Sequence, residues 1–192
     1  MSFFAQAARA DINRYLSEGA TSARSQFNAL RFNEGLQAIL VYRFGRLLVA
    51  RKNVVTAWPL LAMGWLLYAL AAVLMRKGYG IHLSLTAEIA PGFYIGHFGG
   101  IEVANCRIGE RCSVGQLTKI GRPVERDGPQ IGNGVWIGAH AKLFGPIKVG
   151  DNATIAPGAR VTKNIQRNSL VVGDPGRVVF GRYDNSRIVA GI

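Results

Sequence analysis

Hydrophobic and polar positions follow two different patterns along this chain, and the change comes at Gly78-Tyr79-Gly80. Before that point, hydrophobic residues recur at helical spacing from Ser25 to Lys52, which predicts an amphipathic helix. The next segment, Val54 to Met75, has 22 residues without a charge and predicts an apolar helix that Pro59 interrupts. After Gly80, glycine becomes frequent and helical spacing ends. We therefore expect a helical region over residues 1–80 with an apolar helix over 54–75, a second domain over 81–180, and a tail over 181–192.

The second domain carries a repeat with a period of six residues. A one-residue slip and a longer insertion, Gly121 to Gln130, divide its 13 aliphatic positions into three series. These positions are Leu83, Ile89, Ile95 and Ile101; Ile108, Val114 and Ile120; and Ile131, Ile137, Leu143, Val149, Ile155 and Val161. Small residues dominate four positions later: Gly99, Cys112, Thr118, Ala141, Ala153 and Ala159. A parallel β-helix stacks inward aliphatic residues coil upon coil and turns at small corners, so the repeat predicts a mainly β chain of that kind.

The composition and the net charge of the chain indicate which classes of binding partner it could have. The chain has 192 residues, 49% of them hydrophobic, and a formal net charge of +12, which suits nucleic acid, a lipid surface or a phosphorylated cofactor. Its basic residues are scattered, without the aromatic interleaving of a nucleic-acid surface, so we expect no nucleic-acid partner. Two cysteines are too few for a disulfide framework, and the start lacks a signal-peptide pattern. A cytoplasmic protein is expected.

Four segments resemble the hexapeptide-repeat acyltransferases, and among them the serine O-acetyltransferases. They are Gly35 to Leu48, Ile89 to Val103, Ile137 to Gly145, and Val172 to Val178. The resemblance implies a left-handed parallel β-helix with three hexads to a coil, preceded by an α-helical region. It also implies a homotrimer and acetyl-CoA as the acyl donor.

Acetyl transfer to a hydroxyl needs a base that takes the hydroxyl proton. His97 follows a repeat Ile-Gly and precedes Phe98-Gly99-Gly100, and the resemblance makes it the catalytic base. His140, between two alanines, is interpreted as a solvent-facing corner residue. Cys106 and Cys112 have no paired base that we can identify, so direct transfer is expected rather than a covalent acyl-enzyme.

The acceptor-binding positions depart from the family pattern. Gln116 matches the family, but Asp127-Gly128 stand where it has an Arg-His pair, and Gly19-Ala20-Thr21 replace an Asp-Pro. His82 occupies the place of the aspartate that orients the catalytic histidine; the alternatives are a surface histidine at the entry of the first coil, or an alignment off by a residue or two. These departures predict a sugar hydroxyl of an envelope or exopolysaccharide as acceptor. The alternatives are a serine O-acetyltransferase of cysteine biosynthesis and a non-catalytic β-helix scaffold.

Acetyl-CoA is expected in a groove between neighbouring trimer subunits. The resemblance places it along the corners at Gly121, Ala139 and Pro157, with Lys142, Arg160 and Lys163 facing its phosphates. The alternative for these basic residues is a solvated repeat face. No histidine, cysteine or carboxylate cluster has metal-ligand spacing, so no metal is expected.

Two hypotheses remain for the apolar segment over 54–75. Its length suffices to cross a bilayer, but Arg51-Lys52 and Arg76-Lys77 flank both ends, so the positive-inside rule gives no orientation. A single crossing would also separate two parts that resemble one cytosolic enzyme. We therefore expect either a peripheral or re-entrant helix at the cytoplasmic face of a membrane, or helices buried against each other in a soluble protein.

Overall fold

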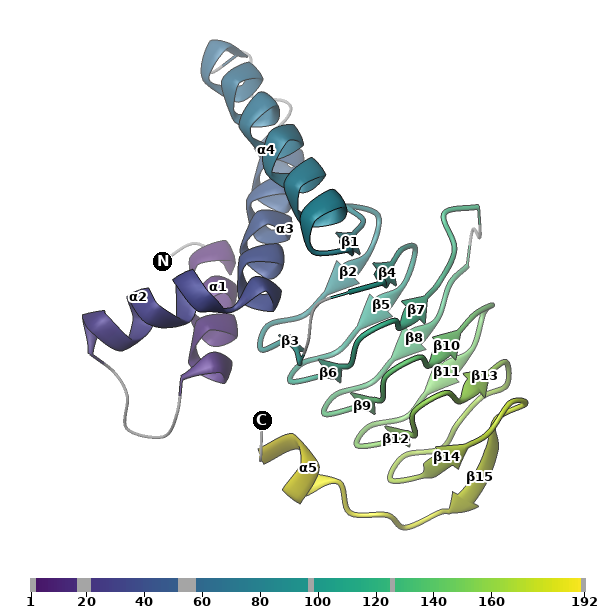
Figure 1. Ribbon diagram of the computed structural model, residues 1–192. Coiled ribbons are helices and arrows are strands. Elements are labelled where there is room, and N and C mark those ends of the chain that lie inside the picture. Colours follow the sequence, from purple (N-terminus) through teal and green to yellow (C-terminus); the bar gives the residue numbers. More distant parts are fainter. Residues whose placement is uncertain (1–2, 17–21, 52–57, 97–98, 125–126, 191–192) are drawn as a thin grey trace.

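The structure is a computed structural model that describes residues 3–16, 22–51, 58–96, 99–124 and 127–190. An α-helical region is followed by a left-handed parallel β-helix of about five coils (Figure 1). The helices are α1 (Phe3–Tyr15), α2 (Ala23–Phe32), α3 (Glu34–Arg51), α4 (Trp58–Gly78) and α5 (Ser186–Ala190). The strands are β1 (Ile81–Leu83), β2 (Glu88–Ile89), β3 (Tyr94–Ile95), β4 (Ile101–Val103), β5 (Arg107–Ile108), β6 (Ser113–Val114), β7 (Lys119–Ile120), β8 (Gln130–Ile131), β9 (Trp136–Ile137), β10 (Lys142–Leu143), β11 (Lys148–Val149), β12 (Thr154–Ile155), β13 (Arg160–Val161), β14 (Leu170–Val172) and β15 (Arg177–Phe180).

Successive coils contribute their strands to three sheets, and the last coil meets sheet B only through a single bridge between Val149 and Ile165. Sheet A has the order β1-β4-β7-β10-β13, sheet B the order β11-β8-β5-β2, and sheet C the order β15-β14-β12-β9-β6-β3. The pairings within the β-helix are parallel, except that β15 runs antiparallel to β14 at the last coil. Going around a coil, the chain passes from sheet A to B to C, so three corners, A–B, B–C and C–A, run along the β-helix.

The repeat's aliphatic residues fill the interior as three columns, one behind each sheet. Stacked residues are hydrogen-bonded neighbours across the coils, and every one of them is buried. The columns are Leu83, Val103, Ile120, Leu143 and Val161; Ile89, Ile108, Ile131, Val149 and Ile165; and Ile95, Val114, Ile137, Ile155 and Val171. The sequence repeat of six residues therefore places one aliphatic side chain in the interior for each strand, because each hexad spans one strand and one corner.

One predicted repeat position was wrong. Val103, and not Ile101, pairs with Leu83 and Ile120 in the column behind sheet A. Ile101 is also buried, but it pairs one step earlier, with Ile81. The chain around Gly99 and Gly100 thus holds two residues more than a regular hexad, and the next hexad is one residue short.

The helices differ from the sequence predictions in two ways. The stretch from Ser25 to Lys52 is not one helix, because Asn33 adopts extended backbone angles and its side chain binds the Ala29 carbonyl oxygen at 2.9 Å, which ends α2. Pro59 does not interrupt the apolar helix, since it lies in the first turn of α4, where its missing N–H costs no hydrogen bond. The helix continues beyond Met75 to Gly78; residues 54–57 of the predicted segment lie outside the described residues.

Side chains of α1 and α3 close the open edge of the first coil, where no further coil supplies hydrogen-bond partners. The Tyr42 hydroxyl donates to the Ala87 carbonyl at 2.7 Å, and the Arg43 guanidinium donates to the Ala90 carbonyl at 2.8 Å. Asp11 accepts from the Gly92 N–H at 2.8 Å and from Arg43 Nε, also at 2.8 Å, and both of these charged side chains are buried. An unpaired strand edge would otherwise expose its polar groups, so the helices fix the first coil in place.

Candidate functional site

The corner between sheets C and A collects several of the predicted site residues. Hydrogen bonds stack its successive turns: Leu117 N–H to the Gly99 carbonyl, His140 N–H to the Gln116 carbonyl, and Gly158 N–H to the Ala139 carbonyl, each at 2.8 Å. Leu117, His140 and Gly158 all have positive φ, which gives these turns the same shape. Gln116, Ala139 and Pro157 therefore form one continuous ridge, the C–A ridge, which stacks through Leu117 on Gly99, two residues after His97 in the sequence.

His97 and Phe98 themselves lie outside the described residues. Before them, Tyr15 of α1 binds both backbone groups of Ile95, accepting from N–H at 2.8 Å and donating to the carbonyl at 3.2 Å. After them, a Cβ built on Gly99 would meet no other part of the described chain within 4 Å, so the surface there is open among the described residues. Rigid backbone before the histidine and open space after it suit a catalytic base that a substrate must approach.

The outward face of sheet A adjoins this ridge and carries one charged or titratable side chain from each strand. His82, Glu102, Lys119, Lys142 and Arg160 follow one another in register from β1 to β13. Lys119 Nζ lies 3.3 Å from Glu102, and Arg160 Nε lies 3.1 Å from Asp174. Lys142, exposed between them, has no carboxylate within ion-pair distance among the described residues. The face is net cationic and suits phosphate groups.

His82 stands at the end of this row that lies next to the helices. Its side chain is half-buried beside α3 and α4, in a small crevice that also contains Tyr42 and Tyr68. Burial and, to a lesser degree, Arg76 lower the pKa of His82, while Glu102 opposes them. The imidazole is therefore neutral at pH 7. Gly80, two residues before His82, closely approaches the chain that follows His97 in the sequence: a Cβ on Gly80 would lie 2.9 Å from the Gly100 nitrogen.

Other predicted residues lie at the A–B corner, across sheet A from the C–A ridge. Gly121 is buried with a φ of 67°, and a Cβ on it would lie 1.8 Å from the Ala104 carbonyl oxygen, so the corner requires glycine there. Lys163 is exposed on a later turn of the same corner. Asp127 lines a pocket of about 260 Å³ with Glu88 and Arg107 of sheet B. Within one chain, Asp127 and Gln116 are thus on opposite edges of sheet A.

The two cysteines are buried and face the interior. Burial raises the pKa of the Cys106 thiol and of the Cys112 thiol to about 12. Thiols of this kind stay protonated at neutral pH and do not act as nucleophiles. In the part of the chain that the structure describes, no group of three or more histidine, cysteine and carboxylate side chains is placed to hold a metal ion.

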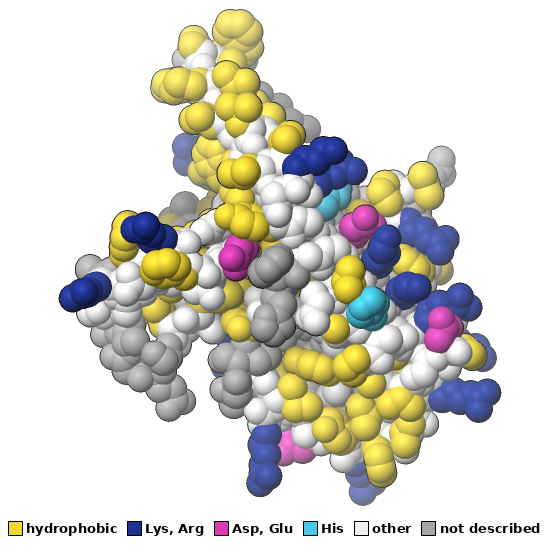
Figure 2. Space-filling view, viewed as in Figure 1, with side chains coloured by type: hydrophobic (Ala, Val, Ile, Leu, Met, Phe, Trp, Pro, Cys, Tyr) yellow, Lys and Arg dark blue, Asp and Glu magenta, His cyan; other side chains and the backbone are white. Residues whose placement is uncertain are grey.

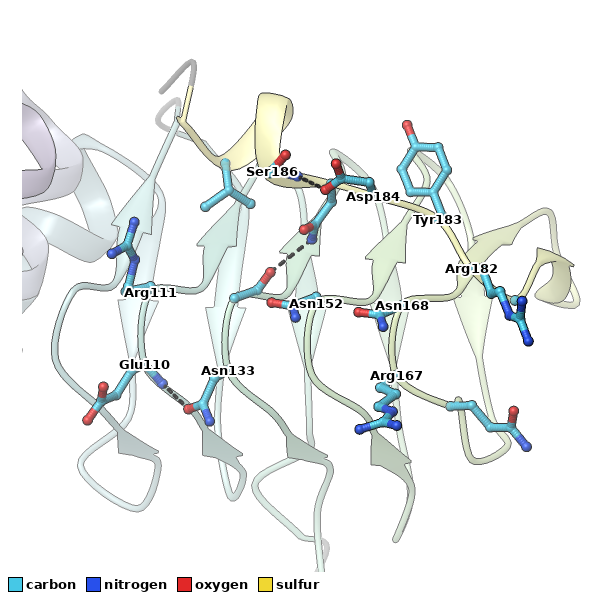
Figure 3. Close-up of a pocket in the computed structure, with 15 residues that line it drawn as sticks. Glu110, Arg111, Asn133, Asn152, Arg167, Asn168, Arg182, Tyr183, Asp184 and Ser186 are labelled. Atoms are coloured by element: carbon cyan, nitrogen blue, oxygen red, sulfur yellow. Dashed lines mark hydrogen bonds between the residues drawn. The ribbon is translucent and has the colours of Figure 1, made fainter.

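A pocket also lies away from these residues, at the B–C corner under the C-terminal tail (Figure 3). Its volume is about 1020 Å³, and its polar lining includes Arg111, Arg167 and Arg182. Asn185 of the tail donates to the Gly134 carbonyl at 2.9 Å and holds the tail over this corner. None of the predicted site residues that the structure describes lines this pocket. Sequence analysis did not predict it, because the tail that forms one of its walls carries no repeat.

Sequence reasoning also missed Glu102 and Lys119, which belong to the charged row of sheet A. The signal was present, since each charged residue of this row directly precedes an aliphatic residue of the column behind sheet A. For Glu102 this signal was hidden, because the sequence repeat assigned Ile101 to the column in place of Val103, the residue that follows Glu102.

Comparisons with known proteins agree on the kind of protein. The family described as bacterial transferase hexapeptide (six repeats) matches residues 128–163. A serine acetyltransferase of Bacillus subtilis is 32% identical over 162 residues, which cover 82% of this chain and 70% of that protein. A serine acetyltransferase of Synechococcus elongatus is 28% identical over 171 residues, which cover 87% of this chain and 66% of that protein. This chain is thus similar to about two thirds of each relative's length.

A solved structure resembles the whole arrangement, helices included. It is a serine acetyltransferase of Brucella abortus in complex with coenzyme A, with a TM-score of 0.73 and 23% sequence identity. The alignment covers 92% of this chain and 67% of that one. At 23% sequence identity, this structural similarity establishes the fold alone.

Proposed function

Because this chain belongs to the serine acetyltransferase family of hexapeptide-repeat transferases, we propose that it transfers an acetyl group from acetyl-CoA to a hydroxyl group. The observation that carries the proposal is the alignment of the C–A ridge with the cationic face of sheet A. The ridge stacks on Gly99, two residues after His97 in the sequence, and Lys142 and Arg160 lie beside it on successive coils. One extended acetyl-CoA molecule could therefore place its thioester at the ridge and its phosphates on the cationic face.

His97 is the general base in this proposal. It takes the proton of the acceptor hydroxyl while the oxygen attacks the thioester carbonyl carbon. The tetrahedral intermediate then collapses, its C–S bond breaks, and the imidazolium returns the proton to the CoA thiolate. The products are an acetyl ester and free CoA. The buried, protonated thiols of Cys106 and Cys112 favour this direct transfer over an acyl-enzyme.

The donor is held by backbone groups and by cations. The C–A ridge offers the backbone at Ala139 and Pro157, and the open surface at Gly99 admits the thioester. Lys142 and Arg160 on sheet A, and Lys163 at the A–B corner, are the phosphate partners in this proposal. Gly121 contributes by shaping that corner, since its Cα is buried against Ala104.

We propose a homotrimer as the active form. Sheet A supplies one wall of the donor groove, and a neighbouring subunit supplies the other. The positions of Gln116 and Asp127 support this, because both can line one acceptor site only if they come from different subunits. Sedimentation equilibrium tests it: the expected mass is three times the 20.8 kDa of one chain, and an active monomer would rule the trimer out.

Two acceptors remain, each with its own support. The names of the relatives favour L-serine. The residues Asp127-Gly128, in place of an Arg-His pair, favour a sugar hydroxyl of an envelope or exopolysaccharide. The test measures CoA release with L-serine and with a panel of sugars and nucleotide sugars, using wild type and His97→Ala. His97-dependent release with one of them identifies the acceptor, and no His97-dependent release with any acetyl acceptor argues for a non-catalytic scaffold.

A further inference from the structure

Helix α4 carries an apolar face that no other described element covers. Eight large hydrophobic side chains on it are between 53% and 72% exposed, and they include Trp58, Leu67, Leu70 and Leu74. Only Gly64 and Met75 of its 21 residues are buried. Figure 2 shows hydrophobic side chains gathered on the part of the molecule that projects away from the β-helix. Soluble proteins rarely leave so large a contiguous apolar surface in water, so a partner is expected.

The packing of α4 against α3 keeps this face outward. The two helices approach each other closely at two glycines: a Cβ on Gly45 would lie 2.5 Å from the Tyr68 ring, and a Cβ on Gly64 would lie 2.9 Å from Leu48. These contacts also show that the helices run antiparallel. Rotating α4 to bury Leu67 and Leu70 would place larger side chains where only glycine fits.

The charges around the apolar face are positive. Arg51 is exposed at the C-terminal end of α3, and Arg76 and Lys77 are exposed in the last turn of α4. In the described part of the helical region there are only two acids, and one of them, Asp11, is buried and paired with Arg43. An apolar surface bordered by cations is complementary to an anionic lipid bilayer and less so to a second cationic copy of this chain.

The contacts of α3 decide how α4 meets the bilayer. A 21-residue helix is about 31 Å long, which is enough to span. However, Arg46 of α3 donates to the Leu85 carbonyl at 2.9 Å, and α3 at this level also packs on α4. The first coil therefore lies beside the C-terminal half of α4. A spanning α4 would bring His82, Glu102 and the polar edge of that coil into the hydrocarbon core.

We propose that α4 lies in the plane of the membrane interface, with its apolar face in an anionic bilayer and Arg51, Arg76 and Lys77 at the lipid phosphates. The cytoplasmic leaflet, with its anionic lipids, is the surface concerned. This docking does not rest on the proposed acetyl transfer. It would hold sheet A, which begins directly after α4, near the membrane.

Vesicle flotation tests the proposal with the full chain. We expect it to float with vesicles of phosphatidylcholine and phosphatidylglycerol and to bind pure phosphatidylcholine much more weakly. Arg76→Glu/Lys77→Glu should weaken binding to the anionic vesicles by more than about tenfold. Leu67→Gln/Leu70→Gln/Leu74→Gln should abolish binding, whereas Val178→Gln/Phe180→Gln, which changes exposed apolar residues at the other end of the molecule, should bind like wild type.

A depth measurement separates docking from spanning. Leu60 and Leu74 are on the same side of α4 and about 21 Å apart along its axis. Spin labels on Leu60→Cys and Leu74→Cys should report the same shallow depth, and the buried native thiols leave these cysteines as the labelled sites. Unequal depths differing by most of that distance would overturn the in-plane arrangement. No binding to anionic vesicles, together with a larger assembly that the Leu67→Gln/Leu70→Gln/Leu74→Gln variant dissociates, would overturn the membrane proposal in favour of contact between copies of the chain.

Discussion

The Tyr15 hydroxyl forms hydrogen bonds with both backbone groups of Ile95, accepting from its N–H at 2.8 Å and donating to its carbonyl at 3.2 Å. Ile95 is two residues before His97, so a helix near the N-terminus holds the strand that leads into the predicted base. Burial raises the pKa of Tyr15, which keeps the hydroxyl protonated and able to donate. The helical region is therefore part of the support of the site.

Removing this hydroxyl should weaken both stability and activity. Tyr15→Phe leaves the N–H and carbonyl of Ile95 without partners, which is expected to cost about 1–3 kcal/mol in the free energy of unfolding. The urea midpoint should fall, and kcat should fall while the KM for acetyl-CoA changes little. Tyr183→Phe, in the C-terminal tail beside the last coil, is the matched control. An unchanged urea midpoint and kcat for Tyr15→Phe would show that α1 does not position this strand.

His97→Ala should reduce turnover by roughly a hundred- to ten-thousand-fold, because that is what a positioned general base typically contributes to the rate. The CoA affinity, measured by calorimetry, should stay near that of wild type. His140→Ala is the control on the same C–A ridge and should have a far smaller effect. Near-normal turnover of His97→Ala would refute its assignment as the base.

Charge on sheet A should govern donor affinity. Lys142→Ala/Arg160→Ala is expected to raise the KM for acetyl-CoA by about tenfold or more with little change in kcat, because phosphate contacts bind substrate and transition state alike. Lys148→Ala removes an equally exposed cation from sheet B and should leave the KM unchanged. If Lys142→Ala/Arg160→Ala and Lys148→Ala had the same KM for acetyl-CoA, the outward face of sheet A would not be part of the donor site.

The native thiols should resist modification. Since burial raises the pKa of Cys106 and of Cys112 to about 12, almost no thiolate exists at pH 8 in the folded protein. A thiol reagent should therefore react slowly with the native chain and rapidly with both cysteines in denaturant. Fast reaction of either cysteine in the native protein would contradict this environment.

Much of the β-helix could be predicted because its repeat is local. Every aliphatic position but one of the 13 lies in a buried column, since the inward residue of each strand is set by a spacing of six along the chain. The exception, Ile101, falls where Gly99 and Gly100 add residues between two strands. An insertion of that kind shifts the register, and only the hydrogen bonds between coils show that Val103 takes the place of Ile101.

The helical region was predicted less well, because its elements depend on contacts distant in sequence. Asn33 ends α2 through its own side chain, and Pro59 is accommodated only because α4 begins at Trp58. The pairing of Asp11 with Arg43, and of both with the first coil, has no signature in the sequence.

The sequence by itself determined the fold family, the interior columns, the candidate base His97 and the apolar character of the segment that forms α4. Those features follow from side-chain type and short-range spacing. Only the tertiary structure decided which predicted residues are neighbours: Gln116, Ala139 and Pro157 share one ridge, while Gly121, Lys163 and Asp127 lie across sheet A. The physical reason is that corners separated by one strand in sequence are on different edges of the coil, whereas corners separated by a full coil stack directly on each other.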